Sequence, residues 1–364
     1  MKKLSQPKLL LGLLGVFFIF IALFLFVNLT KIRLWITYPR NNEVSATDWY
    51  QKLEIVQGAE KELTPSILGT SESTVKKLLE ATRFAKEANS LALVILHHGK
   101  VVLQQYQGDE DKVLNSMSMM KTILALLVGI AIDEGKITSE TDLVSKYLID
   151  WKDWESTKVR IVDLLQMASG LDFDNKVSFF SDLGSLHLGG NVTSFVSRPK
   201  VFEDPQKKYR YSNFDAEVVS VVLEKATGYR FSHYLQEKLW KPLAASDAKV
   251  WVDSISGYAK TYCCFFAKPR DWARVGQLIL DKGKVDGKQI VSERWIKKMT
   301  IPSPLNKEYG YFLFIEKYGY KLAGRHEQRV YVLPKQDLVI VRMGENPEKV
   351  GFEWKDDYLP SLFK

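Results

Sequence analysis

The feature that most constrains this chain is an unbroken apolar segment near its N-terminus. Residues 9–27 contain no charge and no strongly polar side chain. As a helix with a rise of 1.5 Å per residue, this segment would be about 28 Å long, close to the thickness of a bilayer's hydrocarbon core. Lys2, Lys3 and Lys8 precede it, which favours a cytoplasmic N-terminus. We therefore expect an N-terminal transmembrane helix.

A cleaved signal peptide is the alternative interpretation of the same segment. The apolar run is long for a signal peptide, and residues 26–30 contain no small residues in the spacing of a cleavage site. We therefore expect a single-pass protein of the cell (inner) membrane. It would comprise a short cytoplasmic tail at residues 1–8, an anchor at 9–29, a juxtamembrane extension at 30–88 and an extracytoplasmic or periplasmic domain at 89–364.

The composition is that of a globular protein. Of the 364 residues, 46% are hydrophobic and 26% are charged, which excludes a mainly disordered or coiled-coil chain. The net charge of +8 is scattered along the sequence, so we expect no nucleic-acid partner. The five histidines lack the spacing of zinc ligands, so we expect no metal. Cys263 and Cys264 lie in an apolar run, where a bridge between neighbours would be strained, and we expect them to pack unpaired.

Strand patterns occur at both ends of the chain after the extension. Residues 91–96 and 101–106 read as a hairpin, and residues 311–315, 329–333 and 338–343 read as short strands near the C-terminus. Helical patterns lie before and between them, at residues 72–88, 118–133, 161–167, 215–226, 231–239 and 271–280. We expect an α+β fold, in which both strand sets form one antiparallel sheet and the helical middle forms an inserted lobe.

The sharpest local motif is Ser118-x-x-Lys121. The Ser-x-x-Lys pattern occurs six times, but only this copy opens a long apolar helix directly after a strand hairpin. The spacing puts both side chains on one helix face, and the helix start favours negative charge developing on the hydroxyl. Lys121 could accept the hydroxyl proton only if burial lowered its pKa. The alternative is a capping serine followed by a lysine that extends to solvent.

Two further motifs could complete a site with these residues. Tyr211 and Asn213 stand just before a predicted helix, where a phenol could transfer a proton and an amide could bind Lys121 or a substrate carbonyl. A helix-entry turn is the alternative interpretation. Gly324 and Arg325 lie among the C-terminal strands, where a strand beside the serine could offer a backbone N–H to an oxyanion. A bulge or tight bend is the alternative there.

The order of these motifs resembles that of the serine β-lactamase and penicillin-binding-protein-like hydrolases. Three scaffold segments, at residues 163–171, 239–243 and 270–276, are also similar, and they look closest to the 6-aminohexanoate-dimer hydrolase branch. The resemblance implies a β-lactamase-like fold, a small-molecule or peptide acyl substrate and no cofactor.

The resemblance also implies a role for each motif residue. Ser118 would form an acyl-enzyme, Lys121 would be its proton partner and Tyr211 the general acid and base. Asn213 would be a supporting polar residue. Gly324 would let the substrate approach the strand, and the N–H groups of Ser118 and Arg325 would form the oxyanion hole.

Two departures from the family pattern leave the substrate open. Leu322 stands where the β-lactamases carry a cation, and Glu327 stands where the branch has glycine. We therefore expect amide or ester hydrolysis rather than penicillin hydrolysis. The alternatives are D-Ala-D-Ala carboxypeptidase or β-lactamase activity on peptidoglycan-like substrates, or a catalytically dead relative that binds such compounds. Arg325 or His326 could also contact an anionic substrate, or could simply be solvated.

Overall fold

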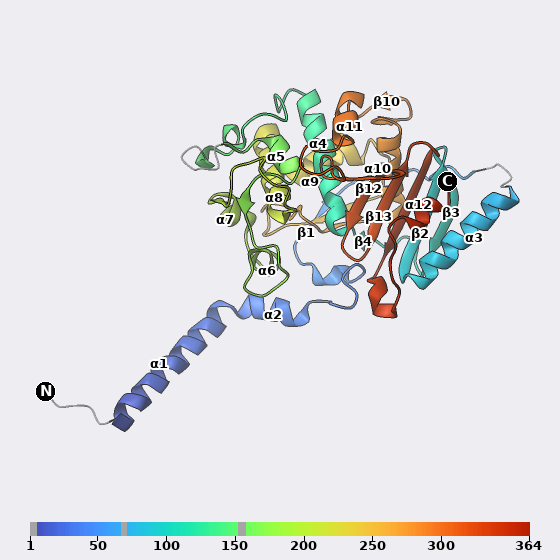
Figure 1. Ribbon diagram of the computed structural model, residues 1–364. Helices are drawn as coiled ribbons and strands as arrows, with labels where there is room; N and C mark the ends of the chain where they lie inside the picture. The colour runs from blue at the N-terminus through green and yellow to red at the C-terminus, as the bar shows by residue number, and fades with distance from the viewer. Residues whose placement is uncertain (1–5, 67–70, 152–157) are drawn as a thin grey trace. The chain divides into compact units, whose positions relative to one another are not determined.

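The computed structural model describes residues 6–66, 71–151 and 158–364, and these divide into two compact units (Figure 1). One unit comprises the described part of Met1–Tyr38 together with Asp174–Gly190. The other comprises the described parts of Pro39–Phe173 and Asn191–Lys364. The predicted tail at residues 1–8 lies largely outside the described residues, as do Lys2 and Lys3.

The smaller unit contains α1 (Gln6–Val27), α2 (Leu29–Thr37) and α6 (Asp182–His187). Lys31 Nζ of α2 donates to Ser185 Oγ at 2.9 Å. Among the described residues no single helix has the length and hydropathy of a membrane span. The pair Leu13–Val27 and Leu29–Thr37 meets both criteria together, with a bend of 65° between its members. The membrane anchor thus stays a prediction.

The larger unit is built on a six-stranded antiparallel sheet that joins the two ends of the sequence. Its strands, in spatial order, are β11 (Phe314–Glu316), β12 (Gly319–Gly324), β13 (Gln328–Leu333), β14 (Leu338–Gly344), β2 (Ser90–His97) and β3 (Lys100–Tyr106). At its centre Ile95 of β2 lies opposite Ile340 of β14. This pairing confirms the predicted antiparallel sheet of N- and C-terminal strands.

Helices cover both faces of this sheet. Helix α10 (Pro269–Leu280) packs against β2, β13 and β14 on one face. On the other face, α3 (Glu72–Glu87) and the short α12 (Tyr358–Ser361) enclose an apolar cluster with β2, β13 and β14 (Figure 1). Phe84 of α3 stacks on Tyr358 with ring centroids 4.5 Å apart. Burial on both faces explains why the central strands are almost continuously apolar.

The chain between the strand sets forms the predicted helical lobe. Its helices are α4 (Met120–Asp133), α5 (Ile161–Leu165), α7 (Val192–Val196), α8 (Asn213–Thr227), α9 (Phe231–Leu235) and α11 (Glu293–Met299). A π-helical turn, Gln236–Trp240, extends α9. Helix α4 is almost wholly buried and packs against α8 and α11. Because α4 carries the Ser-x-x-Lys motif, its position determines where that motif lies.

The sequence patterns did not predict a second, four-stranded antiparallel sheet. Its strands are, in order, β1 (Leu53–Val56), β7 (Ala248–Trp251), β8 (Phe265–Ala267) and β4 (Leu114–Asn115), and β7 and β8 lie among the predicted helices of residues 161–280. Its strands have two to four residues, too few to show a two-residue period. Two-stranded sheets also join β5 (Leu171–Asp172) to β6 (Lys200–Val201) and β9 (Lys284–Val285) to β10 (Lys288–Gln289).

Two elements of the predicted extension at residues 30–88 contribute to the larger unit. Strand β1 pairs with β7, with Leu53 opposite Trp251, and α3 packs on β2. The boundaries that the sequence suggested between extension and domain stay predictions.

Gly129 of α4 lies against the indole ring of Trp295 in α11. A β-carbon at this position would overlap that ring, whose Nε1 donates to the Ala125 carbonyl at 2.8 Å. Glycine here lets α11 approach the buried helix α4 closely.

We expect Gly129→Ala to lower the free energy of unfolding by about 1–3 kcal/mol, because the added methyl group displaces a buried tryptophan. In an open helix the same change would stabilise by about 1 kcal/mol. Thermal and urea unfolding of the purified full-length protein measure the difference. Lys76→Ala, on the exposed side of α3, is the control and should shift stability by less than about 0.5 kcal/mol. A Gly129→Ala protein as stable as the wild type would contradict the packing described.

Candidate active site

Ser118 lies in a tight turn rather than at the first residue of α4. The predicted helix of residues 118–133 begins as a 3₁₀ turn, Met117–Met119, and becomes α-helical at Met120. Met117 has a φ of +50°, and its N–H donates to Asn115 Oδ1 at 3.0 Å. The Ser116 N–H donates to the Phe265 carbonyl of β8 at 2.9 Å. These contacts hold a strained turn that presents Ser118.

Lys121 reaches Ser118 from within the protein. Its side chain is only 2% exposed, and its Nζ lies 3.0 Å from Ser118 Oγ, 2.9 Å from Asn213 Oδ1 and 2.5 Å from the Tyr262 carbonyl oxygen. Burial lowers the pKa of Lys121 to about 7, although the nearby carboxyls of Glu217 and Asp215 act in the opposite direction. An amine in this position can be neutral at physiological pH, which a base for the Ser118 hydroxyl must be.

Tyr211 and Asn213 approach the same point from the start of α8. The Lys121 Nζ lies 5.2 Å from the centre of the Tyr211 ring, and Tyr211 also forms a hydrogen bond with Ser118. Enclosure by the protein raises the pKa of the Tyr211 phenol above its ordinary value, and the hydrogen bond with Ser118 opposes this shift. The phenol is therefore protonated at neutral pH and can give a proton.

The end of β12 lies against the turn that presents Ser118. A β-carbon on Gly324 would be 2.5 Å from the Ser116 carbonyl oxygen and 2.9 Å from Met117 Cβ, so only glycine permits this approach. Leu322, two residues earlier, is completely buried. The position that carries a cation in β-lactamases is thus apolar here and does not reach solvent.

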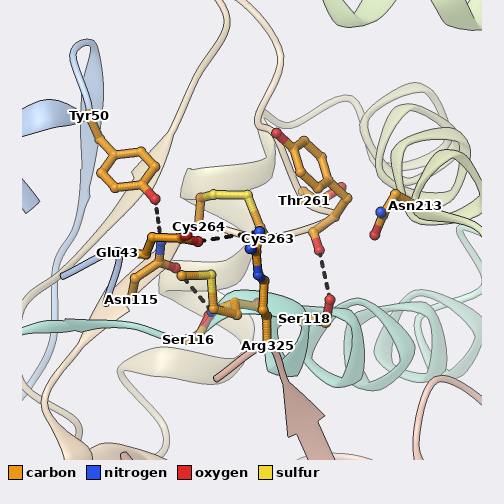
Figure 2. The surroundings of a disulfide bond; sticks show 12 residues. Glu43, Tyr50, Asn115, Ser116, Ser118, Asn213, Thr261, Cys263, Cys264 and Arg325 are labelled. Carbon is orange, nitrogen blue, oxygen red and sulfur yellow. Dashed lines mark hydrogen bonds and ion pairs between the residues drawn. A yellow bond between two sulfur atoms is a disulfide. The ribbon is translucent and has the colours of Figure 1, made fainter. Parts of the chain in front are cut away.

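Arg325 and His326 direct their side chains to another segment of the larger unit. Arg325 lies 3.4 Å and His326 3.0 Å from the buried carboxylate of Glu43, and Figure 2 shows Arg325 and Glu43 near Ser116. His326 and Glu327 both have a φ near +60°. Glycine adopts this conformation most readily, which explains why a glycine is the usual residue at the position of Glu327. Glu327 instead forms an ion pair with Arg329.

The prediction that Cys263 and Cys264 are unpaired packing residues is wrong. The structure joins them in a disulfide between neighbouring residues, and Figure 2 shows the bridge beside the Ser116–Ser118 turn. Both cysteines are buried, as expected, and Cys264 has a φ of +68°. The pair directly follows Tyr262, whose carbonyl oxygen contacts Lys121.

Three residues near the amine were not found from the sequence. The first two are the carboxyls Asp215 and Glu217 of α8, and the third is Tyr262, which acts through its main chain. Glu217 follows Asn213 by four residues, and this spacing places both on one face of α8. The sequence therefore contained a pattern that could have indicated Glu217. No sequence pattern indicates a backbone carbonyl such as that of Tyr262.

The structure brings Ser118, Lys121, Tyr211 and Asn213 together, with Gly324 against the Ser118 turn. In the described part of the chain, no cluster of three or more histidine, cysteine or carboxylate side chains is arranged to hold a metal ion. The arrangement can perform acyl transfer with its own side chains, because it contains a hydroxyl, a buried amine and a phenol within contact of one another.

Comparison with known sequences identifies the family. The sequence pattern of the family described as Beta-lactamase matches residues 74–353. The chain belongs to the beta-lactamase family. The members related to it are serine hydrolases, and this is the class of enzyme that the contacts around Ser118 indicate.

Individual relatives are distant. The 6-aminohexanoate-dimer hydrolase of Paenarthrobacter ureafaciens is 23% identical over 299 residues, which cover 72% of this chain and 74% of that protein. A protein of Salmonella agona, named provisionally as a D-alanyl-D-alanine carboxypeptidase, is 26% identical over 42% of this chain and 41% of its own. A solved structure from Bacillus anthracis, named provisionally as a 6-aminohexanoate-dimer hydrolase, superposes with a TM-score of 0.72 at 18% identity. It covers 88% of this chain and 90% of its own.

We expect reaction of Ser118 with a fluorophosphonate to become faster as the pH rises through about 7, where Lys121 loses its proton. Below that pH the amine is protonated and has no lone pair for the hydroxyl proton. The measurement is the labelling rate between about pH 5 and about pH 9. A Lys121→Arg protein, whose guanidinium stays protonated, should label at least about 100-fold more slowly and show no such rise. A wild-type rate that still rises about tenfold per pH unit at about pH 9, without levelling off, would indicate a solvated lysine instead.

Proposed function

We propose that this protein is a membrane-anchored serine hydrolase that cleaves an amide or ester bond through an acyl-enzyme on Ser118. One observation carries the proposal: the buried Lys121 amine, with a pKa lowered to about 7, lies 3.0 Å from Ser118 Oγ. A lysine that only capped the turn would have no reason to be buried, because its charge would be better solvated outside.

In the first half of the reaction, Ser118 Oγ attacks the substrate carbonyl carbon while its proton passes to neutral Lys121. The carbonyl oxygen becomes an oxyanion, which the backbone N–H groups of Ser118 and Arg325 would stabilise. The carbon–nitrogen or carbon–oxygen bond then breaks, and the leaving group takes a proton from Tyr211. Lys121 returns its proton to the phenol, so the acyl-enzyme forms with both partners restored.

In the second half, a water molecule replaces the leaving group. Its oxygen attacks the acyl carbon while its proton passes through the Tyr211 hydroxyl to neutral Lys121. Lys121 then gives this proton to Ser118 Oγ as the ester bond breaks. The hydroxyl of Ser118 is restored and the product leaves as an acid. Asn213 would hold Lys121 throughout, because its Oδ1 accepts from Nζ at 2.9 Å.

The apolar surroundings of Leu322 favour an amide or ester over a β-lactam. A β-lactam carries a carboxylate that needs a cation, and Leu322 replaces the cation that the resemblance would place there. The relative from Paenarthrobacter ureafaciens, named as a 6-aminohexanoate-dimer hydrolase, supports an amide. Peptides ending in D-Ala-D-Ala are the second candidate class, supported by the relative from Salmonella agona.

We expect a Ser118→Ala protein to lose at least about 1,000-fold in hydrolysis of any substrate that the wild type turns over, because it lacks the nucleophile. The experiment is mass spectrometry of wild type mixed with a linear amide, a p-nitrophenyl ester, a D-Ala-D-Ala peptide and a penicillin. The acyl mass should appear on the peptide containing Ser118.

The matched control is Ser73→Ala, which alters another Ser-x-x-Lys copy at the exposed start of α3 and should leave activity unchanged. Equal turnover by wild type and Ser118→Ala would refute the assignment of the nucleophile. Binding of a substrate with neither turnover nor an acyl mass would instead identify a catalytically dead relative.

The proposed location is the cell (inner) membrane, with the hydrolase outside the cytoplasm. The apolar composition of α1 supports this, as does the combined length of α1 and α2. The basic residues Lys31 and Arg33 of α2 follow the apolar segment closely, so the charge bias that sets orientation is weak.

We expect the full-length protein to sediment with membranes and to resist extraction by salt and alkaline carbonate. Arginines introduced at Val16 and Phe20 should release it, because each costs about 2.5–3.5 kcal/mol at the centre of a span. Protease added to spheroplasts measures orientation, and digestion of the hydrolase is the expected result. Recovery of the full-length chain in the soluble fraction would contradict the anchor.

A further inference from the structure

The three neighbours of the Lys121 amine differ in what they can exchange with it. Asn213 Oδ1 and the Tyr262 carbonyl oxygen can only accept hydrogen bonds, whereas Ser118 Oγ can also donate. A neutral amine has two N–H bonds and one lone pair. When both N–H bonds point to the two acceptors, the lone pair is left for the hydroxyl of Ser118, 3.0 Å away.

This geometry makes the position of the Tyr262 carbonyl important. If that oxygen moved away, one N–H of Lys121 would lose its acceptor and the amine could rotate about its own axis. An N–H could then face Ser118 in place of the lone pair. Proton transfer depends on such alignment, and a displacement of about 1 Å can cost about 100-fold in rate.

Glu217 of α8 holds the Tyr262 segment in place. Its Oε1 accepts from the Tyr262 N–H at 2.7 Å and from Thr261 Oγ1 at 3.3 Å. The Thr261 hydroxyl also lies 3.1 Å from the Ala216 carbonyl oxygen, which ties the segment to α8 a second time. Glu217 is only 1% exposed, so solvent does not compete for these contacts.

We propose that Glu217 is a positioning residue for Lys121: by binding Tyr262 it fixes the carbonyl acceptor that turns the lone pair of the amine toward Ser118. The proposal rests on the proposed function, in which Lys121 accepts the proton of Ser118. One face of α8 would supply both constraints, since Asn213 binds the amine directly and Glu217 binds it through Tyr262.

The charges around Glu217 fit this role. Burial raises the pKa of Glu217 to about 8, while the Tyr262 N–H, Thr261 and the two lysines Lys260 and Lys121 favour its ionised form. Lys260 is itself buried, with Nζ 3.9 Å from the centre of the Trp251 ring.

Other charges act on the two lysines. Asp215 of α8, like Glu217, raises the pKa of Lys121 against the larger effect of burial. Asp253 raises and Lys52 lowers the pKa of Lys260, and burial lowers it most, to about 7. Because the pKa of Glu217 is raised to about 8, its carboxyl is largely protonated at the pH where Lys121 titrates. Loss of the Glu217 side chain should therefore leave the pH at which Ser118 labelling rises close to that of the wild type.

Two variants of Glu217 differ in whether they keep an acceptor for the Tyr262 N–H. Glu217→Ala removes both the acceptor for the Tyr262 N–H and the charge, and we expect Ser118 to label with fluorophosphonate about 100-fold more slowly at its optimal pH. Glu217→Gln keeps an oxygen that can accept from the same N–H. It should label within about threefold of wild type, with a wild-type pH profile.

The matched control is Glu224→Gln on the same helix. Glu224 is another enclosed carboxyl of α8 whose Oε1 accepts a backbone N–H, from Phe231 at 2.9 Å, but Lys121 does not affect its pKa. This variant should keep both the wild-type rate and the wild-type pH profile. Thermal unfolding of all three variants shows whether each is folded under the conditions of labelling.

The results distinguish the two proposals. Wild-type rate and pH profile in Glu217→Ala would overturn the positioning role. Equally slow labelling of Glu217→Ala and Glu217→Gln would also overturn it, since the glutamine oxygen can still accept from the Tyr262 N–H. Absence of Ser118 labelling in the wild type would instead remove the proposed function itself.

Discussion

The structure around Ser118 depends on the burial of one amine. Lys121 lies at the start of a helix that is apolar on nearly every side, so its side chain has no route to solvent. A buried charge is costly, and the protein offsets this cost through polar contacts and a lowered pKa rather than through a single strong ion pair. The position of α8, of the Tyr262 segment and of the Ser118 turn all follow from the need to surround that amine.

The large sheet and most helices could be predicted because their patterns are long. The first strand of the hairpin at residues 91–106 and the strands near the C-terminus carry runs of four or more apolar residues, and most of the predicted helices span several turns. The motif residues were found for a different reason: their order along the chain resembles that of a known family. The long apolar helix that follows Ser118 also separated this Ser-x-x-Lys copy from the other five.

The parts that sequence did not reveal are short or act through the main chain. Strands β7 and β8 have four and three residues, so their pattern is lost among neighbouring helices. The sequence did not predict the bridge between Cys263 and Cys264, because a bridge between neighbours was expected to be strained. Arg325 and His326 were candidates for contact with an anionic substrate, yet both bind Glu43. Glu43 lies more than 280 residues away in the sequence, and no sequence pattern indicated this pairing.

The use of a main-chain oxygen at Tyr262 affects how this enzyme would be compared with distant homologues. Every amino acid carries the same carbonyl group, so the identity of the residue at that position is free to drift while the acceptor persists. An alignment scored letter by letter would pass over such an acceptor. Superposition of backbones, with attention to which carbonyl faces the lysine, would recover it in proteins whose sequences no longer resemble this one.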